Sequence, residues 1–213
     1  MMLEIKNITY QPQTSYKEIL ENINFKVKDK EIILISGRSG SGKTSLLEII
    51  AGLVKEQKGQ IFWKNKIISP RERRWLCGLV FQFPERFFIG NTILKELKIG
   101  HKLINRDRIS SVLNQVGLTK INLSMPPENL SGGQQRRLAV AVQLLRDPNI
   151  ILLDEPTAGL DWSMKNEVKD LINGLKMRKT IIVVTHEAEL FNKLSTKNFI
   201  LDKGKIKLIG ENK

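Results

Sequence analysis

At Gly37-Arg38-Ser39-Gly40-Ser41-Gly42-Lys43-Thr44 the sequence fits the pattern G-x-x-x-x-G-K-[ST], which forms loops that hold phosphate groups. The residues before it, 31–35, are typical of a buried strand, and the residues after it, 45–51, have helical spacing. Glycines let successive backbone N–H groups converge on one anion, and the start of a helix adds a favourable dipole. A flexible Gly/Ser turn would need neither neighbour, so this context favours a nucleotide site.

The side chains of this loop have distinct expected roles. Lys43 is expected to reach the β- and γ-phosphates of a nucleotide, and the hydroxyl of Thr44 to coordinate Mg²⁺. The candidate nucleotide-binding residues of the loop are Gly37, Arg38, Ser39, Gly40, Ser41, Gly42, Lys43, Thr44 and Ser45.

The composition is typical of one soluble, globular domain over residues 1–213. Of the 213 residues, 41% are hydrophobic and 27% charged, and no apolar run approaches the roughly 18 residues that a membrane span needs. The amino terminus lacks the apolar core of a signal peptide. The single cysteine, Cys77, excludes an internal disulfide and is best explained as a buried thiol in a reducing cytosol.

The formal net charge of +13 leaves three interpretations open: a solvated basic surface, an anionic membrane face nearby, and nucleic-acid binding. The lysines are scattered over the chain and form no single block, which favours the solvated surface. They occur in groups such as Lys26, Lys28 and Lys30, then Lys55 and Lys58, then Lys203, Lys205 and Lys207.

Strands and helices are expected to alternate, which predicts an α/β core. A charged turn is expected at 71–74, after Pro70, and a good N-cap at Ser131 begins a helix through 136–146. Helical spacing also covers 92–116, 162–177 and 187–193. Strand patterns cover 3–10, 19–27, 60–63, 66–68, 79–81, 149–153, 180–185, 198–201 and 205–209.

Further motifs follow the loop in a fixed order: Leu130-Ser131-Gly132-Gly133-Gln134, then the apolar run 150–153 ending in Asp154-Glu155, then Gly159-Leu160-Asp161, then His186. Together they resemble the ATP-binding-cassette (ABC) ATPases over essentially the whole chain. The resemblance implies a P-loop NTPase core with a RecA-like, mostly parallel sheet. It also implies an N-terminal antiparallel β subdomain, a helical subdomain at about 84–147 that carries LSGGQ, and ATP and Mg²⁺ as cofactors.

The chemistry of the strand ends agrees with this resemblance. Asp154 could hold Mg²⁺ together with Thr44, or it could simply cap a strand. Glu155 is placed to polarise the attacking water, as the family's catalytic carboxylate does, although a solvated loop glutamate remains an alternative. Gln82 resembles the family's glutamine that senses Mg²⁺ and water, and His186 resembles the histidine that contacts the γ-phosphate. His186 could otherwise only begin a helix.

Other residues are assigned through the resemblance. Tyr10 matches the aromatic side chain that stacks on adenine, with Tyr16 as a competitor. Ser131-Gly132-Gly133, followed by Gln134, is a second anion site at a helix N-terminus. In the family, one ATP lies between the P-loop of one subunit and the LSGGQ of another, in a head-to-tail dimer. Asp161, which could also cap the next helix, matches an aspartate at that dimer interface.

The resemblance favours a transporter subunit over an ABC protein that acts on nucleic acid or as a stand-alone assembly factor. Nucleic-acid relatives usually carry two cassettes or a long coiled coil between P-loop and LSGGQ, whereas this interval is only about 90 residues. Residues 80–93 resemble the energy-coupling-factor and cobalt-type ATPases, which serve importers of vitamins and metal ions. The implied partners are a second ATPase subunit, identical or related, and an integral membrane subunit, with no nucleic acid. The implied location is the cytoplasmic face of a membrane.

The segment after Gln82 is unusually aromatic. Phe83, Phe87, Phe88 and Ile89 gather around Pro84, so they belong either to the core or to a docking surface. We expect this segment to form a groove with the following helix and to receive a short helix of the membrane subunit.

Overall fold

The structure is a computed structural model that describes residues 2–101 and 103–212. Its strands are β1 (Leu3–Tyr10), β2 (Leu20–Val27), β3 (Ile32–Ser36), β4 (Lys58–Trp63), β5 (Lys66–Ile67), β6 (Cys77–Val80), β7 (Ile150–Asp154), β8 (Thr180–Thr185), β9 (Lys197–Asp202) and β10 (Lys205–Glu211). Its α-helices are α1 (Lys43–Ile50), α2 (Pro70–Leu76), α3 (Ile93–Lys98), α4 (Arg106–Gln115), α5 (Gly132–Leu145) and α6 (Trp162–Leu175). Short 3-10 helices cover Pro84–Phe87, Pro127–Asn129 and Ala188–Leu190.

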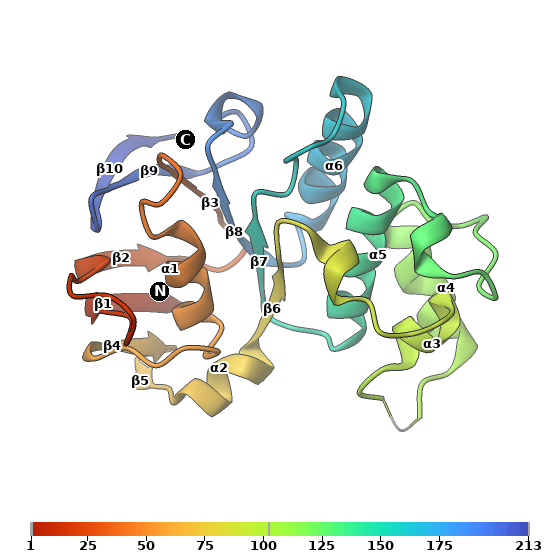
Figure 1. The fold of residues 1–213 in the computed structure, drawn as a ribbon, viewed down its shortest axis with the longest axis horizontal. Helices are drawn as coiled ribbons and strands as arrows, with labels where there is room; N and C mark the ends of the chain where they lie inside the picture. Colours follow the sequence, from red (N-terminus) through yellow and green to blue (C-terminus); the bar gives the residue numbers. More distant parts are fainter. Residues whose placement is uncertain (1, 102, 213) are drawn as a thin grey trace.

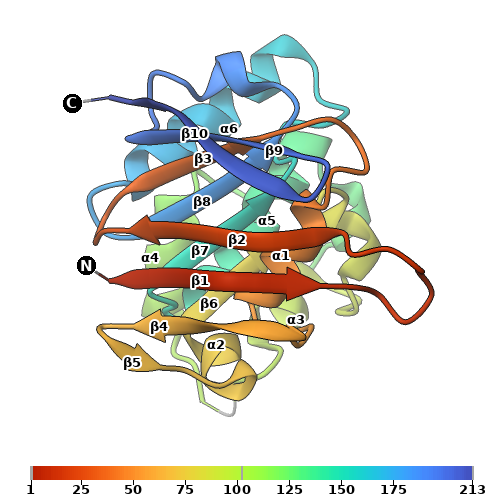
Figure 2. The ribbon, with the colours of Figure 1, turned by 90° about the vertical axis from the view of Figure 1, so that its left-hand side faces the viewer.

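The strands form two sheets. One has four antiparallel strands in the order β2-β1-β4-β5, and the other has six strands in the order β10-β9-β3-β8-β7-β6. In the larger sheet all neighbouring pairs are parallel except β9 with β10. Helix α1 lies between the two sheets (Figures 1 and 2). This arrangement confirms the expected α/β class, with an antiparallel sheet built from the first 70 residues.

The larger sheet separates two hydrophobic cores. Side chains alternate along β3, so Ile33 and Ile35 join the core with α1 and the smaller sheet, whereas Ile32 and Leu34 face the other core. That second core is formed with α3, α4, α5 and α6, and the first three of these helices gather at one side of the molecule in Figure 1. Both faces of β3, β7 and β8 are therefore covered, which explains their nearly continuous apolar sequences.

Cys77 begins β6 and is buried, as expected. Its thiol donates to the Ile50 carbonyl at the end of α1, 3.6 Å away. Burial raises the pKa of Cys77 to about 12, although nearby Arg73 and Arg146 oppose the shift. The thiol is therefore neutral at physiological pH.

Three expectations about local structure are wrong. Residues 71–74 are not a turn but part of α2, because Ser69 and Glu72 form a reciprocal capping box around Pro70 at the first helical position. Helical spacing over 92–116 becomes two helices, α3 and α4, with Gly100 between them at a φ of +79°. Residues 187–193 form only the 3-10 helix Ala188–Leu190, since the chain must turn there to enter β9.

No helix among the described residues is both long and apolar enough to cross a bilayer.

Candidate functional site

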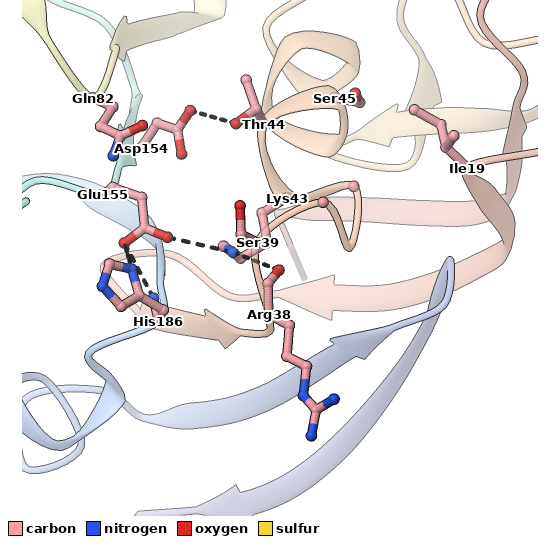
Figure 3. Close-up of a pocket in the computed structure, with 12 residues that line it drawn as sticks. Ile19, Arg38, Ser39, Lys43, Thr44, Ser45, Gln82, Asp154, Glu155 and His186 are labelled. Atoms are coloured by element: carbon pink, nitrogen blue, oxygen red, sulfur yellow. Dashed lines mark hydrogen bonds and ion pairs between the residues drawn. The ribbon is translucent and has the colours of Figure 1, made fainter. Parts of the chain in front are cut away.

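The loop between β3 and α1 borders a cavity of about 600 Å³ at the carboxyl ends of the parallel strands (Figure 3). This edge of an α/β sheet is where ligands generally bind. Besides the loop, four of the expected side chains line the cavity: Gln82, Asp154, Glu155 and His186. The fold therefore brings residues from four separate stretches of the chain to one place.

Two close approaches of the backbone require glycine in this loop. A Cβ atom at Gly37 would lie 2.3 Å from the carbonyl oxygen of Leu201. Gly42 has a φ of +100°, and a Cβ atom there would lie 2.9 Å from the Ile19 carbonyl oxygen. The loop can therefore bend tightly against β2 and β9 only with glycine at these positions.

Lys43 curls back over its own loop. Its Nζ donates to the carbonyl oxygens of Gly37, at 2.8 Å, and Arg38, at 3.1 Å. It also forms an ion pair with Glu155, with Nζ 3.3 Å from Oε1. The ammonium group thus lies between the backbone of the loop and the carboxylate of Glu155 (Figure 3).

Asp154 and Glu155 occupy the end of β7 and the following residue. The Thr44 hydroxyl donates to Oδ2 of Asp154 over 2.7 Å. Glu155 has a φ of +45°, an uncommon conformation for a residue other than glycine. Its Oε2 accepts from the backbone N–H of His186, at 3.1 Å, and lies 2.8 Å from His186 Nδ1.

Asp154 is 4% exposed, and burial is the largest cause that raises its pKa. The charge of Glu155 raises it further, whereas the hydrogen bond from Thr44 and the charge of Lys43 lower it, and the net shift is upward. A buried carboxylate whose charge is incompletely balanced favours a cation nearby.

This donor set fits Mg²⁺. Carboxylate and hydroxyl oxygens are hard ligands, and Mg²⁺ is commonly bound by one or two carboxylates together with substrate phosphates and water. Within residues 2–101 and 103–212, no cluster of three or more His, Cys, Asp or Glu side chains could bind a metal by itself. Around Thr44 and Asp154, phosphate oxygens and water would complete the coordination of Mg²⁺.

The two tyrosines considered for stacking on adenine, Tyr10 and Tyr16, do not line the cavity. Tyr16 is fully exposed, and Tyr10 packs against the core at the end of β1. The lining residue there is Ile19, whose backbone N–H donates to the Tyr10 carbonyl oxygen over 2.9 Å. Tyr10 is thus adjacent to the cavity, and stacking on adenine stays a prediction. No motif marks Ile19, whose position follows only from the pairing of β1 with β2.

The second group of predicted residues lies apart from the cavity. Ser131 caps α5 with Gln134 in a reciprocal capping box, with bonds of 3.3 Å and 2.9 Å. Asp161 caps α6 by accepting from the Met164 N–H over 2.9 Å. The two helix starts are neighbours, since a Cβ atom at Gly132 would lie 3.2 Å from Leu160. Neither helix start contributes to the lining of the cavity.

The comparisons with known proteins agree with this geometry. A family model described as ABC transporter matches residues 20–158, more than half of the chain. A protein of Arabidopsis thaliana, "ABC transporter I family member 11, chloroplastic", is 39% identical over 204 residues, covering 87% of this chain and 72% of that protein. The "Energy-coupling factor transporter ATP-binding protein EcfA2" of Caldanaerobacter subterraneus subsp. tengcongensis is 34% identical over 226 residues, covering 99% and 79%.

Two solved structures share the fold. One is cbiO1 from Clostridium perfringens, described as part of the ABC transporter complex cbiONQ, with a TM-score of 0.89 and 27% identity, covering 99% of this chain and 88% of that one. The other is a dimeric ATP-binding cassette in a post-hydrolysis state with ADP and Pi, with a TM-score of 0.83 and 28% identity, covering 99% and 98%.

Proposed function

We propose that this chain is the ATP-hydrolysing subunit of a transporter whose membrane-spanning part is a separate protein. The premise is that the chain belongs to the ABC transporter family and is an ATPase. One observation carries the proposal: the phosphate loop, Asp154, Glu155 and His186 line one cavity. The subunit would act at the cytoplasmic face of the membrane, with the membrane protein as its partner.

The relatives support a direction of transport and a class of transported substrate. The EcfA2 protein is named as an energy-coupling-factor subunit, and residues 80–93 resemble the same group. Uptake of a vitamin or a transition-metal ion is therefore the substrate class we propose. Contacts with that substrate belong to the membrane partner, because the cavity described above is shaped for phosphates.

For hydrolysis we assign Glu155 as the base that polarises the attacking water, with His186 holding its carboxylate. Lys43 and the backbone N–H groups of the loop would bind the β- and γ-phosphates. Asp154 and Thr44 would hold Mg²⁺, whose charge stabilises the phosphate oxygens during transfer. Gln82 also lines the cavity, beside Asp154 in Figure 3.

The two separate groups of site residues support a head-to-tail dimer. At the start of α5, Ser131 and Gly132 are exposed, Gln134 is half-buried and Gly133 is buried, and the nearby Asp161 is exposed. These residues lie on elements other than the phosphate loop. A second ATPase subunit, identical or related, would present this surface to the ATP held by the first.

The segment after Gln82 is suited to docking the membrane subunit. A groove of about 140 Å³ lies between this segment and helices α3 and α5, with Phe81 and Phe87 on its wall. Their rings stack with centroids 4.8 Å apart, and Phe87 is 57% exposed. Phe88 is half-buried, packs against the core and also lines the groove. We assign the groove to a short helix of the membrane subunit, with Phe87 and the 79% exposed Ile89 as its contacts.

This docking proposal gives a direct test. Phe87→Ser combined with Ile89→Ser should prevent co-purification with the membrane subunit, because both exposed apolar contacts are lost, while basal ATP hydrolysis stays intact. Tyr16→Ser is the matched control, since Tyr16 is also exposed but lies in the connection between β1 and β2. Normal assembly of the double variant would contradict the assignment of the groove.

The ATPase assignment is tested at Lys43. Lys43→Ala should weaken ATP binding by about tenfold to a hundredfold, because each hydrogen bond to a charged group contributes about 1.5–3 kcal/mol. Calorimetric titration with ATP measures the loss. Lys58→Ala, in exposed β4, should bind ATP as the unmodified protein does. Equal affinities of the two variants would overturn the phosphate-loop assignment.

A further inference from the structure

The side chain of Arg136 has no assigned role in the site, yet it is almost completely buried. It projects from the second turn of α5 and is 6% exposed. Burial lowers the pKa of its guanidinium, although Glu85 opposes the shift. A buried arginine needs hydrogen-bond acceptors around it, since an unpaired buried charge is strongly unfavourable. The hydrogen-bond acceptors of Arg136 come from two different loops.

One side of the guanidinium contacts the segment that follows β6. Nη1 donates to the carbonyl oxygen of Gln82. The carboxylate of Glu85 lies 3.8 Å from the same nitrogen, and the ring of Phe83 lies 5.7 Å from the guanidinium carbon. Arg136 thus contacts Gln82, which lines the cavity, and two residues of the segment that we assign to docking, Phe83 and Glu85.

The other side contacts a different loop. Nη2 of Arg136 donates to the Ala158 carbonyl oxygen over 2.7 Å. Ala158 is itself tied to the end of β7, because its N–H donates to the Glu155 carbonyl oxygen over 3.0 Å. The same loop continues to Asp161, the cap of α6. This contact therefore connects α5 to the stretch between the proposed base and the proposed dimer surface.

We propose that Arg136 is a positioning residue that couples the docking segment to the loop 155–161 and to the start of α5. The proposal rests on the proposed function, because it assigns a route by which a docked partner reaches the site. A displacement of Gln82 and Phe83 moves the guanidinium, and the guanidinium moves Ala158 and the helix that begins at Ser131. Only arginine suits this position, since its planar fork offers several donors in fixed directions, whereas lysine is a single point charge.

The neighbouring Arg137 provides a matched control. It lies on the same helix and is also largely buried, but its guanidinium donates to the Gly117 carbonyl oxygen, at 3.3 Å, and pairs with Glu167 of α6. It therefore holds α5 against other elements without contacting Gln82 or Ala158. Each of these arginines loses its guanidinium group when it is replaced by lysine, and only Arg136→Lys should affect the coupling, whereas Arg137→Lys should not.

The test uses the isolated subunit, so that it does not depend on finding the membrane partner. For Arg136→Lys we expect ATP affinity to stay within about twofold, because Lys43 and the loop are untouched. Turnover should fall by about tenfold or more, since a misplacement of about 1 Å can cost about a hundredfold in rate. Hydrogen exchange should accelerate at both 82–88 and 156–161, but not along α1. Arg137→Lys should show neither effect.

Three outcomes would overturn the proposal: unchanged turnover, faster exchange in only one of the two segments, or the same changes in Arg137→Lys. Melting curves check that the two variants are equally folded. If Arg136→Lys unfolds, the double variant Glu85→Gln with Phe83→Leu weakens the same contacts from the other side and should slow turnover in the same way. Normal turnover in this double variant would also overturn the proposal. Failure of the unmodified protein to co-purify with a membrane subunit would contradict the proposed function and would leave these measurements on the isolated subunit unaffected.

Discussion

Glu155 is held by Lys43 and by His186 at once. Lys43 pairs with one of its oxygens, and the backbone and ring of His186 contact the other. A phosphate that enters the loop competes for Lys43 and would release one oxygen of Glu155 toward water.

This arrangement predicts the behaviour of Glu155→Gln. The amide keeps the size of the side chain but cannot take a proton, so ATP should still bind while turnover falls by about a hundredfold to ten-thousandfold, the range of a positioned general base. Titration and steady-state hydrolysis separate the two effects. Near-normal turnover of Glu155→Gln would show that another residue acts as the base.

Asp154 gives a pH dependence with a defined sign. Because its pKa is raised in the folded protein, mainly by burial, its contribution to stability is complete below the unfolded pKa of about 3.9 and is lost as pH rises through the folded value. Asp154→Asn keeps an acceptor for Thr44 but carries no charge. It should therefore melt at a higher temperature than the unmodified protein at pH 7, with the difference shrinking toward pH 4.

The same variant should lose Mg²⁺-dependent hydrolysis, because a proposed Mg²⁺ ligand becomes neutral. Thermal scans between pH 4 and pH 8 without nucleotide measure the stability difference. A melting temperature of Asp154→Asn below that of the unmodified protein at pH 7 would show that ionised Asp154 stabilises the fold, against the direction of its pKa shift.

At the scale of elements, local signals were predictable and non-local contacts were not. Ser131 and its helix followed from the capping pattern, and β1 and β8 have the predicted bounds. Helix α2 was missed because its charged residues outweighed the capping box at Ser69. The strand ends that bring Glu155 and His186 together follow from parallel pairing, but the contacts of Arg136 span 54 and 22 residues. No sequence pattern predicts side-chain contacts between residues so far apart in the chain.

The capping box of α2 can be tested by itself. Ser69→Ala removes the acceptor for the Glu72 N–H, at 3.3 Å, and the hydroxyl that donates to its carboxylate, at 2.6 Å. The free energy of unfolding should fall by about 1 kcal/mol, as is typical for lost N-caps. Denaturant titration measures it, and ATP turnover should not change because α2 does not border the cavity. A loss below about 0.3 kcal/mol would mean that packing alone holds the helix.

At the scale of the whole molecule, the two groups of proposed site residues lie apart on one chain. The cavity holds the phosphate loop, Asp154 and Glu155, whereas Ser131 and Asp161 begin helices α5 and α6 elsewhere on the surface. A second subunit can bring its Ser131 to the first subunit's nucleotide. ATP binding would then be favoured by association, and hydrolysis would release the pair.

Glu155→Gln should therefore form a dimer with Mg-ATP, because the nucleotide that bridges the subunits is not consumed. Size-exclusion chromatography compares ATP with ADP, which lacks the bridging γ-phosphate and should leave the variant monomeric. Adding Ser131→Arg should abolish the dimer, since the larger side chain obstructs the helix start that faces the nucleotide. Ser111→Arg, on the exposed side of α4, is the control and should dimerise normally. A Glu155→Gln variant that stays monomeric with ATP at high concentration would contradict a site shared between two copies of this chain.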